Sequence, residues 1–365
     1  MQNPSPLTRL LIVDDSALMR KLLRDIFTRE PGFEVQTSRD GVDALQQLHR
    51  FQPHVVSLDI NLPGQDGLAC LSRIMVERPT PVVMFSALTE RGASSSAEAM
   101  ALGAVDFMAK PRGAVSLNME KITREFVEKI RGAALAKVRR TRGLAQRVRE
   151  QNRDAADCLP PVSFAQAANF GVVIIGVSTG GPRTLEELLP HLPANFPWPV
   201  IVAQHMPGNF TSALAKRMGD LCTLPVIEVV RPMPLQAGHI YIARGDHDIS
   251  LSQRSQGVVV MPTPPSDDYL WHPSVSGLVK SVQRVFPAPW VIGILLTGMG
   301  YDGAAEMAQL RKNGAHTIAE SEESAVVFGM PLELIRQGGA EMVLPVEHIA
   351  HHLVQWALKL PRAKE

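Results

Sequence analysis

The stretch VVIIGVSTGGP, residues 172–182, decides the fold of the longer part of this chain. Its first half is a run of β-branched residues, typical of a buried strand, and its second half is rich in glycine. Pro182 suits the first turn of a helix, where a missing N–H costs little. The stretch therefore predicts a strand, a tight turn and a helix start, which is the repeating unit of a parallel α/β sheet.

Similar apolar runs follow along the second half of the chain and alternate with helical patterns. The expected strands are 171–175, 199–203, 226–229, 240–243, 258–261, 291–296, 316–319 and 342–344. Helices are expected after Pro182, Phe210, Ser274, Gly303 and Ser324. This alternation predicts a large, doubly wound α/β domain, which we assign to residues 169–360.

The first part of the chain repeats the same alternation on a smaller scale. Strands are expected at 9–13, 34–37, 54–58, 81–85 and 104–107, with helices at 17–27, 41–51, 67–76 and 94–102. Five such units predict a flavodoxin-like domain with five parallel strands, doubly wound, over residues 1–130.

A basic stretch joins the two predicted domains, and we assign residues 131–168 to a linker. Its arginines and lysines favour a solvated helical extension, and the alternative is a contact with nucleic acid. The chain as a whole has a formal net charge of only +1, so no global field attracts nucleic acid or a membrane surface.

Composition places the protein among ordinary globular proteins. The chain has 365 residues, of which 45% are hydrophobic, and its three scattered cysteines lack metal-binding spacing. No apolar run is long enough to span a bilayer, and the first residues do not resemble a secretory signal. We expect a cytoplasmic location.

Polar residues at the ends of four predicted strands of the first domain suggest one site. Asp14 and Asp15 follow the first strand, Asp59 the third, Ser86 the fourth and Lys110 the fifth. The carboxyl ends of parallel strands share one edge of a sheet, and convergent carboxylates suit Mg2+. Each residue alone can be a helix cap or a surface lysine, but their convergence favours a phosphoryl-accepting site.

Ser178 lies in the glycine-rich turn of the opening stretch, beside the start of a helix. Free N–H groups at such a position favour negative charge, which suits a nucleophilic serine whose attack creates an oxyanion. Two alternatives stay open from the turn alone: a cradle for phosphate, or a turn needed only for packing. No G-x-x-x-x-G-K-[ST] motif is present to support phosphate binding.

His205 and Asp302 complete a possible hydrolase site with Ser178. His205 ends the next predicted strand and can act as a general base, while Asp302 lies in a glycine-rich turn after a later strand and can orient the histidine. The alternatives are a structural histidine and a helix-capping aspartate. The order Ser, His, Asp differs from that of α/β-hydrolases, so the residues alone indicate a possible serine hydrolase of unusual topology.

Residues 8–130 resemble response-regulator receiver domains. The motifs that carry the resemblance are Asp14-Asp15-Ser16, Ser57-Leu58-Asp59, Leu62-Pro63, Asp66-Gly67 and Lys110-Pro111. The resemblance implies that Asp59 is the phosphoacceptor and binds Mg2+ together with Asp14 and Asp15. It also implies that Ser86 and Lys110 are the switch residues.

Residues 170–355 resemble the catalytic domain of the chemotaxis protein-glutamate methylesterases. The shared motifs are 176–181, 204–207, Thr211, 273–275, 297–303 and 329–331. The resemblance implies Ser178 as nucleophile, His205 as base, Asp302 as the residue that orients it, and the backbone N–H of Met299 as an oxyanion donor. Within this domain the sequence departs from the family pattern at Ser276-Gly277, Glu320 and Leu332. In the receiver part it departs at Asn61, two residues after Asp59, where receiver domains often have Met.

The two resemblances together imply a function in bacterial chemotaxis. A chemotaxis histidine kinase would phosphorylate the receiver, which otherwise covers the catalytic cleft. The second domain would then hydrolyse glutamyl methyl esters of chemoreceptors, releasing methanol, and deamidate receptor glutamines. The esterase chemistry needs no cofactor, and the membrane is reached only through the receptor. The alternatives are a DNA-binding output domain and the same chemistry in another sensory pathway.

Overall fold

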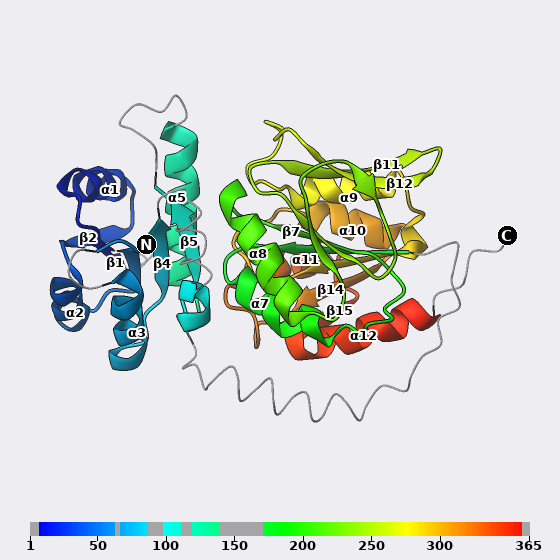
Figure 1. Cartoon of the computed structure of the whole chain (residues 1–365). Helices are drawn as coiled ribbons and strands as arrows, with labels where there is room; N and C mark the ends of the chain where they lie inside the picture. Colours follow the sequence, from blue (N-terminus) through cyan, green and yellow to red (C-terminus); the bar gives the residue numbers. More distant parts are fainter. Residues whose placement is uncertain (1–6, 63–65, 87–97, 111–118, 139–170, 360–365) are drawn as a thin grey trace. The chain divides into compact units, whose positions relative to one another are not determined.

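The computed structural model describes residues 7–62, 66–86, 98–110, 119–138 and 171–359 (Figure 1). The chain divides into two compact units, Met1–Thr141 and Arg142–Glu365, and each is described by itself. Most of the predicted linker, residues 131–168, lies outside the described residues, so the domain boundaries stay a prediction. Helix α5 continues to Ala134, past the expected end of the first domain.

The first unit contains a five-stranded parallel sheet. Its strands are β1 (Thr8–Val13), β2 (Phe33–Ser38), β3 (Val55–Asp59), β4 (Val82–Ser86) and β5 (Asp106–Ala109). They lie in the order β2-β1-β3-β4-β5, with every pair parallel. β3 and β4 are buried throughout because helices cover both faces of the sheet. This is the predicted doubly wound fold.

Helices on both faces close the first unit. They are α1 (Ala17–Arg29), α2 (Gly41–Arg50), α3 (Gly67–Glu77) and α5 (Met119–Ala134), and residues 98–102 are also helical. Side chains of Ser16, Asp40 and Asp66 cap the first three by accepting backbone N–H groups. Phe27 of α1 packs edge-on against Phe126 of α5, so these two helices share one face.

A seven-stranded parallel sheet forms the centre of the second unit (Figure 1). Its strands are β6 (Val172–Val177), β7 (Val200–Gln204), β8 (Val226–Val229), β10 (Ile240–Ala243), β13 (Val291–Leu295), β14 (His316–Glu320) and β15 (Met342–Leu344). They lie in the order β15-β14-β13-β6-β7-β10-β8. From β6 the chain first adds β7, β8 and β10 on one side. Later it returns to the other side of β6 and adds β13, β14 and β15 outward, so the winding direction reverses between β6 and β13.

A small antiparallel sheet stands apart from the parallel one. β12 (Gly257–Thr263) pairs with β11 (Asp248–Arg254) on one side and β9 (Met233–Pro234) on the other. The strand expected at 258–261 therefore exists, but in a hairpin outside the main sheet. Its partner β11 was not predicted because its sequence, DISLSQR, holds too few apolar residues to stand out.

The helices of the second unit form two groups. They are α7 (Gly181–Leu188), α8 (Gly208–Leu221), α9 (Val275–Gln283), α10 (Ala304–Lys312), α11 (Met330–Arg336) and α12 (Val346–Lys359). α9, α10 and α11 contact one another in turn, whereas α7 contacts α8 and α12. The helix expected after Ser324 begins only at Met330, and α12 was not predicted. No helix in the described part of the chain is long and apolar enough to span a membrane.

Candidate active site

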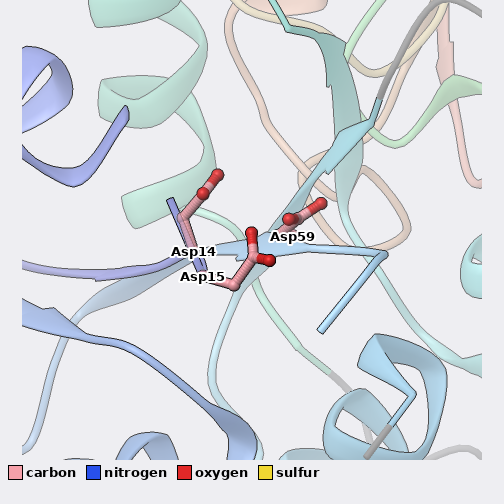
Figure 2. A group of neighbouring side chains, drawn as sticks. All are labelled: Asp14, Asp15 and Asp59. Atoms are coloured by element: carbon pink, nitrogen blue, oxygen red, sulfur yellow. The ribbon is translucent and has the colours of Figure 1, made fainter. Parts of the chain in front are cut away.

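Three carboxylates gather at the carboxyl edge of the first sheet. Asp14 and Asp15 follow β1 and Asp59 ends β3, and these two strands are neighbours. One oxygen of each side chain lies within 4.8 Å of one from each of the others (Figure 2). Asp14 and Asp59 are buried, and Asp15 is exposed. This set of hard oxygen donors, open to solvent on one side, fits Mg2+, which keeps some of its waters.

Lys110 joins two of the carboxylates. Its Nζ lies 2.8 Å from Asp14 Oδ2 and 2.7 Å from Asp59 Oδ2. Burial raises the pKa of Asp59, and the hydrogen bond and charge of Lys110 offset this only in part. Burial alone would lower the pKa of Lys110, but the two carboxylates outweigh it and raise that pKa. Ser86 is fully buried at the end of β4, and its carbonyl oxygen accepts the N–H of Lys110.

In the second unit, Ser178 is presented by a tight turn between β6 and α7. Gly180 has φ +82°, and a Cβ there would lie 2.5 Å from the Cβ of Val326, so only glycine fits. The N–H of Gly181 donates to the carbonyl oxygen of Ser178 and closes the turn at 2.8 Å. The serine is therefore held at the carboxyl edge of the sheet, beside a helix N-terminus.

His205 lies next to Ser178 because their strands are paired. Val177 of β6 is opposite Gln204 of β7, and the N–H of His205 donates to the carbonyl oxygen of Val177 at 3.0 Å. The ring of His205 is buried, with Nε2 2.9 Å from Asp302 Oδ2. Its Nδ1 is buried and has no hydrogen-bond partner in the described part of the chain. Nε2–H therefore donates to Asp302, which leaves the lone pair of Nδ1 free to accept a proton.

Asp302 is held by the start of α9 as well as by the histidine. Its Oδ2 accepts the N–H of Val275 at 2.7 Å, and its Oδ1 accepts the N–H of Ser276 at 2.9 Å. Burial alone would raise the pKa of Asp302, but hydrogen bonds from His205 and Ser276 outweigh it and lower that pKa. The carboxylate thus stays ionised, keeps Nε2 protonated and can stabilise a positive charge on the ring.

The loop after β13 packs directly against Ser178. The N–H of Ser178 donates to the carbonyl oxygen of Thr297 at 2.9 Å, and a Cβ at Gly298 would lie 2.7 Å from the Cβ of Ser178. No described residue accepts a hydrogen bond from the N–H of Met299. A backbone N–H without a described acceptor therefore lies one residue beyond this close contact. That Met299 acts as an oxyanion donor stays a prediction.

The structure places Ser178 and His205 at the ends of adjacent strands and joins the His205 ring to Asp302. It also shows two residues of this region to which the sequence did not point. Trp271 stacks on the His205 ring, with centroids 5.8 Å apart and planes at 7°. Asp248 accepts His272 Nδ1 at 2.9 Å and fixes the loop that carries Trp271. Neither residue belongs to a local motif, so only the tertiary structure identifies them.

These two units define the class of the protein: a response-regulator receiver followed by an α/β output domain with a buried Ser–His–Asp cluster. Residues 10–121 match the response regulator receiver domain, and residues 173–353 match the CheB methylesterase family.

Named relatives cover nearly the whole chain. A protein-glutamate methylesterase/protein-glutamine glutaminase of Rhodospirillum rubrum is 52% identical over 98% of both chains. A relative of the same name from Rhodopseudomonas palustris is 50% identical over 95% of this chain and 98% of its own. The crystal structure of the Thermotoga maritima CheB methylesterase catalytic domain is 36% identical, with a TM-score of 0.50 over 52% of this chain and 99% of that one. The chain therefore belongs to the CheB methylesterase family, in the form that carries an N-terminal receiver domain.

Proposed function

We propose that this chain is a protein-glutamate methylesterase and protein-glutamine glutaminase of bacterial chemotaxis, activated by phosphorylation of its receiver domain. Relatives of this name match both domains over almost their full length. The observation that carries the proposal is the buried cluster of Ser178, His205 and Asp302, in which Asp302 binds one ring nitrogen and the other is free to take a proton.

The catalytic roles follow from the chemistry of these groups. Nδ1 of His205 accepts the proton of the Ser178 hydroxyl as its oxygen attacks the ester carbonyl of a receptor glutamate. The N–H of Met299 stabilises the negative oxygen of the tetrahedral intermediate. The proton on Nδ1 then passes to the departing methoxide, and methanol leaves an acyl-enzyme. A water deprotonated by His205 attacks the acyl-enzyme, the bond to Ser178 Oγ breaks, and the proton on Nδ1 returns to Oγ as the glutamate leaves. Asp302 holds Nε2–H throughout.

Glutamine deamidation would use the same steps. The amide carbonyl takes the place of the ester carbonyl, and the proton from His205 goes to the departing nitrogen, so ammonia is released instead of methanol. Because an amine is a poorer leaving group than an alcohol, the protonation by His205 matters more for this substrate.

The receiver residues would regulate this activity. Asp59 attacks the phosphoryl group of a donor, a chemotaxis histidine kinase in our proposal, and becomes an acyl phosphate. Asp14, Asp15 and Asp59 would hold Mg2+, which neutralises charge on the phosphoryl oxygens. Lys110 already contacts Asp59, and Ser86 ends the adjacent strand, so both can sense the new oxygens. We further propose that the protein is cytoplasmic and meets the membrane only through the receptor.

Methanol release from methyl-labelled chemoreceptor membranes tests the chemistry. We expect wild-type protein to release methanol and Ser178→Ala to reduce the rate by about 10³-fold or more, because no other described group replaces the nucleophile. Ser252→Ala on β11 makes the same chemical change elsewhere in this unit and should leave the rate unchanged. Equal rates for Ser178→Ala and wild type would refute the assignment of the nucleophile.

A further inference from the structure

The ring of His205 has an aromatic neighbour that the proposed mechanism does not use. Trp271 lies parallel to it, with ring centroids 5.8 Å apart and an angle of 7° between the planes. This is the geometry of an offset stack, in which the face of one ring covers part of the other. The contact engages the face of the imidazole, so both ring nitrogens, which lie at its edge, stay available to Asp302 and to Ser178.

Trp271 is fixed in this position from several sides. A Cβ at Gly300 would lie 2.8 Å from the indole ring, so the absence of a side chain there makes room for it. The ring of Tyr301 packs edge-on against the indole, with centroids 5.1 Å apart. The packing of Gly300 and Tyr301 therefore holds Trp271 beside the histidine.

The segment that carries Trp271 is anchored at both ends by one carboxylate. Asp248 accepts the N–H of Ser266 at 2.9 Å before the tryptophan, and after it the ring of His272 at 2.9 Å and the N–H of Ser274 at 2.8 Å. Burial opposes ionisation of Asp248, but the hydrogen bond from His272 and those from the two backbone groups outweigh it and lower its pKa. The anchor is therefore a charged group that holds the loop against the site.

The charge of His205 changes during the reaction, and the attraction between its ring and the indole face changes with it. An aromatic face attracts a positively charged group within about 6 Å of its ring centroid, and it attracts the same group much less when that group is neutral. Among the described residues, Asp302 is the ionised side chain that contacts the imidazole, and it acts at the edge of the ring. Trp271 contacts the face of the imidazole and adds no further charge to the site.

We propose that Trp271 is a positioning residue that stabilises the imidazolium form of His205, and with it the transition states in which this histidine carries a proton. The proposal rests on the function proposed above. The contact is weaker while the ring is neutral, so it favours the transition state over the ground state and acts mainly on kcat.

Replacing the indole tests this role. Trp271→Leu removes the aromatic face but keeps an apolar side chain, and Trp271→Phe keeps a smaller face. We expect kcat for methanol release to fall about 2- to 30-fold in Trp271→Leu, the range that corresponds to cation–π contacts, and to fall less in Trp271→Phe. KM for the receptor should stay within about twofold of wild type. A rise in KM at unchanged kcat would overturn the proposal and make Trp271 a substrate-binding residue.

The pH profile separates charge stabilisation from shielding. His205 must be neutral to act as a base, so kcat/KM rises with pH as the ring loses its proton. If Trp271 stabilises the charged ring, Trp271→Leu moves this acid limb to lower pH. If the indole only excludes water, water reaches the charged ring more easily in the variant. The acid limb of the kcat/KM profile then moves to higher pH, which contradicts the proposal. Trp356→Leu is a matched control, because Trp356 also lies against a histidine, His316, with ring centroids 4.7 Å apart, at the start of β14 away from the site.

A direct titration keeps this test independent of the proposed function. In the full chain labelled with ¹³C-histidine, the signal lost in His205→Gln identifies His205, and its titration can be compared in wild type and both Trp271 variants. A wild-type protein that releases no methanol would refute the function, while this titration still decides the role of Trp271. Identical titration of His205 in all three proteins would overturn the inference. If Trp271→Leu does not fold, Trp271→Phe carries the comparison.

Discussion

The two ring nitrogens of His205 have different surroundings, and this difference supports the roles that we propose for them. Asp302 lies 2.9 Å from Nε2, whereas Nδ1 has no partner among the described residues. In Asp302→Asn the amide can turn its NH2 toward Nε2, which would move the ring proton to Nδ1 and block deprotonation of Ser178. We expect kcat to fall by about 10³- to 10⁴-fold. Asp220→Asn on α8 is the control, and an Asp302→Asn rate within tenfold of it would argue against this orientation of the ring.

Glu320 is a second residue whose environment has a measurable consequence. It is fully buried at the end of β14, where Oε2 accepts the N–H of Thr297 at 2.7 Å and Oε1 accepts the hydroxyl of Ser324 at 2.8 Å. Burial raises its pKa to about 7, and these hydrogen bonds offset the effect only in part, while Glu187 and Glu347 add to it. The folded state therefore binds this proton more tightly than the unfolded chain does.

The sign of the resulting pH dependence follows from linkage. Stability is lost as pH rises from the usual range of a glutamate toward about 7, because the folded state must then hold a buried charge. Glu320→Gln keeps an acceptor for Thr297 without that charge. We expect the variant to lose this pH dependence and to gain up to about 3 kcal/mol over wild type above pH 7.

Tryptophan fluorescence during urea unfolding measures this effect in the second unit alone. All four tryptophans of the chain, Trp198, Trp271, Trp290 and Trp356, lie in that unit. Glu322→Gln, two residues away and exposed, is the matched control. Parallel stability curves for wild type and Glu320→Gln between pH 5 and 8 would show that Glu320 is ionised at lower pH than we infer.

At the scale of elements, the turn between β6 and α7 depends on Gly180. Its φ of +82° disfavours any other residue, and Val326 leaves no room for a Cβ. We expect Gly180→Ala to destabilise the second unit by about 2–4 kcal/mol, from backbone strain and the steric clash together, and to displace Ser178. Urea unfolding and the rate of methanol release measure the two effects.

Gly338→Ala isolates the steric part of this prediction. Gly338 also has a positive φ, +64°, but no atom lies within 4 Å of the position of its Cβ. The control should therefore cost only the backbone strain, about 1–2 kcal/mol, and leave the methanol release rate unchanged. Equal stability losses in the two variants would mean that Val326 moves aside without cost.

The elements also show how far the sequence could predict this protein. Runs of β-branched residues located the strands of both parallel sheets to within about two residues, because buried parallel strands are apolar throughout. The run of β-branched residues at 258–261 could not show that this strand lies in a hairpin, because an apolar run carries no information about its partner strand. Ser178, His205 and Asp302 were expected to meet because each ends or follows a strand. Trp271 was not predicted, because its loop lies far in sequence from His205 and has no periodic pattern.

At the scale of the whole molecule, regulation requires that phosphorylation of Asp59 change the activity of Ser178 in the other unit. A complete switch, from 1% to 99% active, would need about 5.5 kcal/mol of differential stabilisation, so we expect graded activation. Asp59→Asn removes the oxygen that we propose accepts the phosphoryl group, and it leaves the sequence of the second unit unaltered. It should keep the basal rate of methanol release to within a few fold and lose activation.

Receiver control of the esterase is tested by the ratio of methanol release with and without a small phosphodonor and Mg2+, measured on methyl-labelled chemoreceptor. We expect a ratio well above one for wild type and for Asp25→Asn, a control on α1, and a ratio of one for Asp59→Asn. Ser178→Ala should reduce both rates by about 10³-fold or more. Release that persists without Ser178, or activation that persists without Asp59, would contradict the claim that this chain is a serine methylesterase controlled by its own receiver.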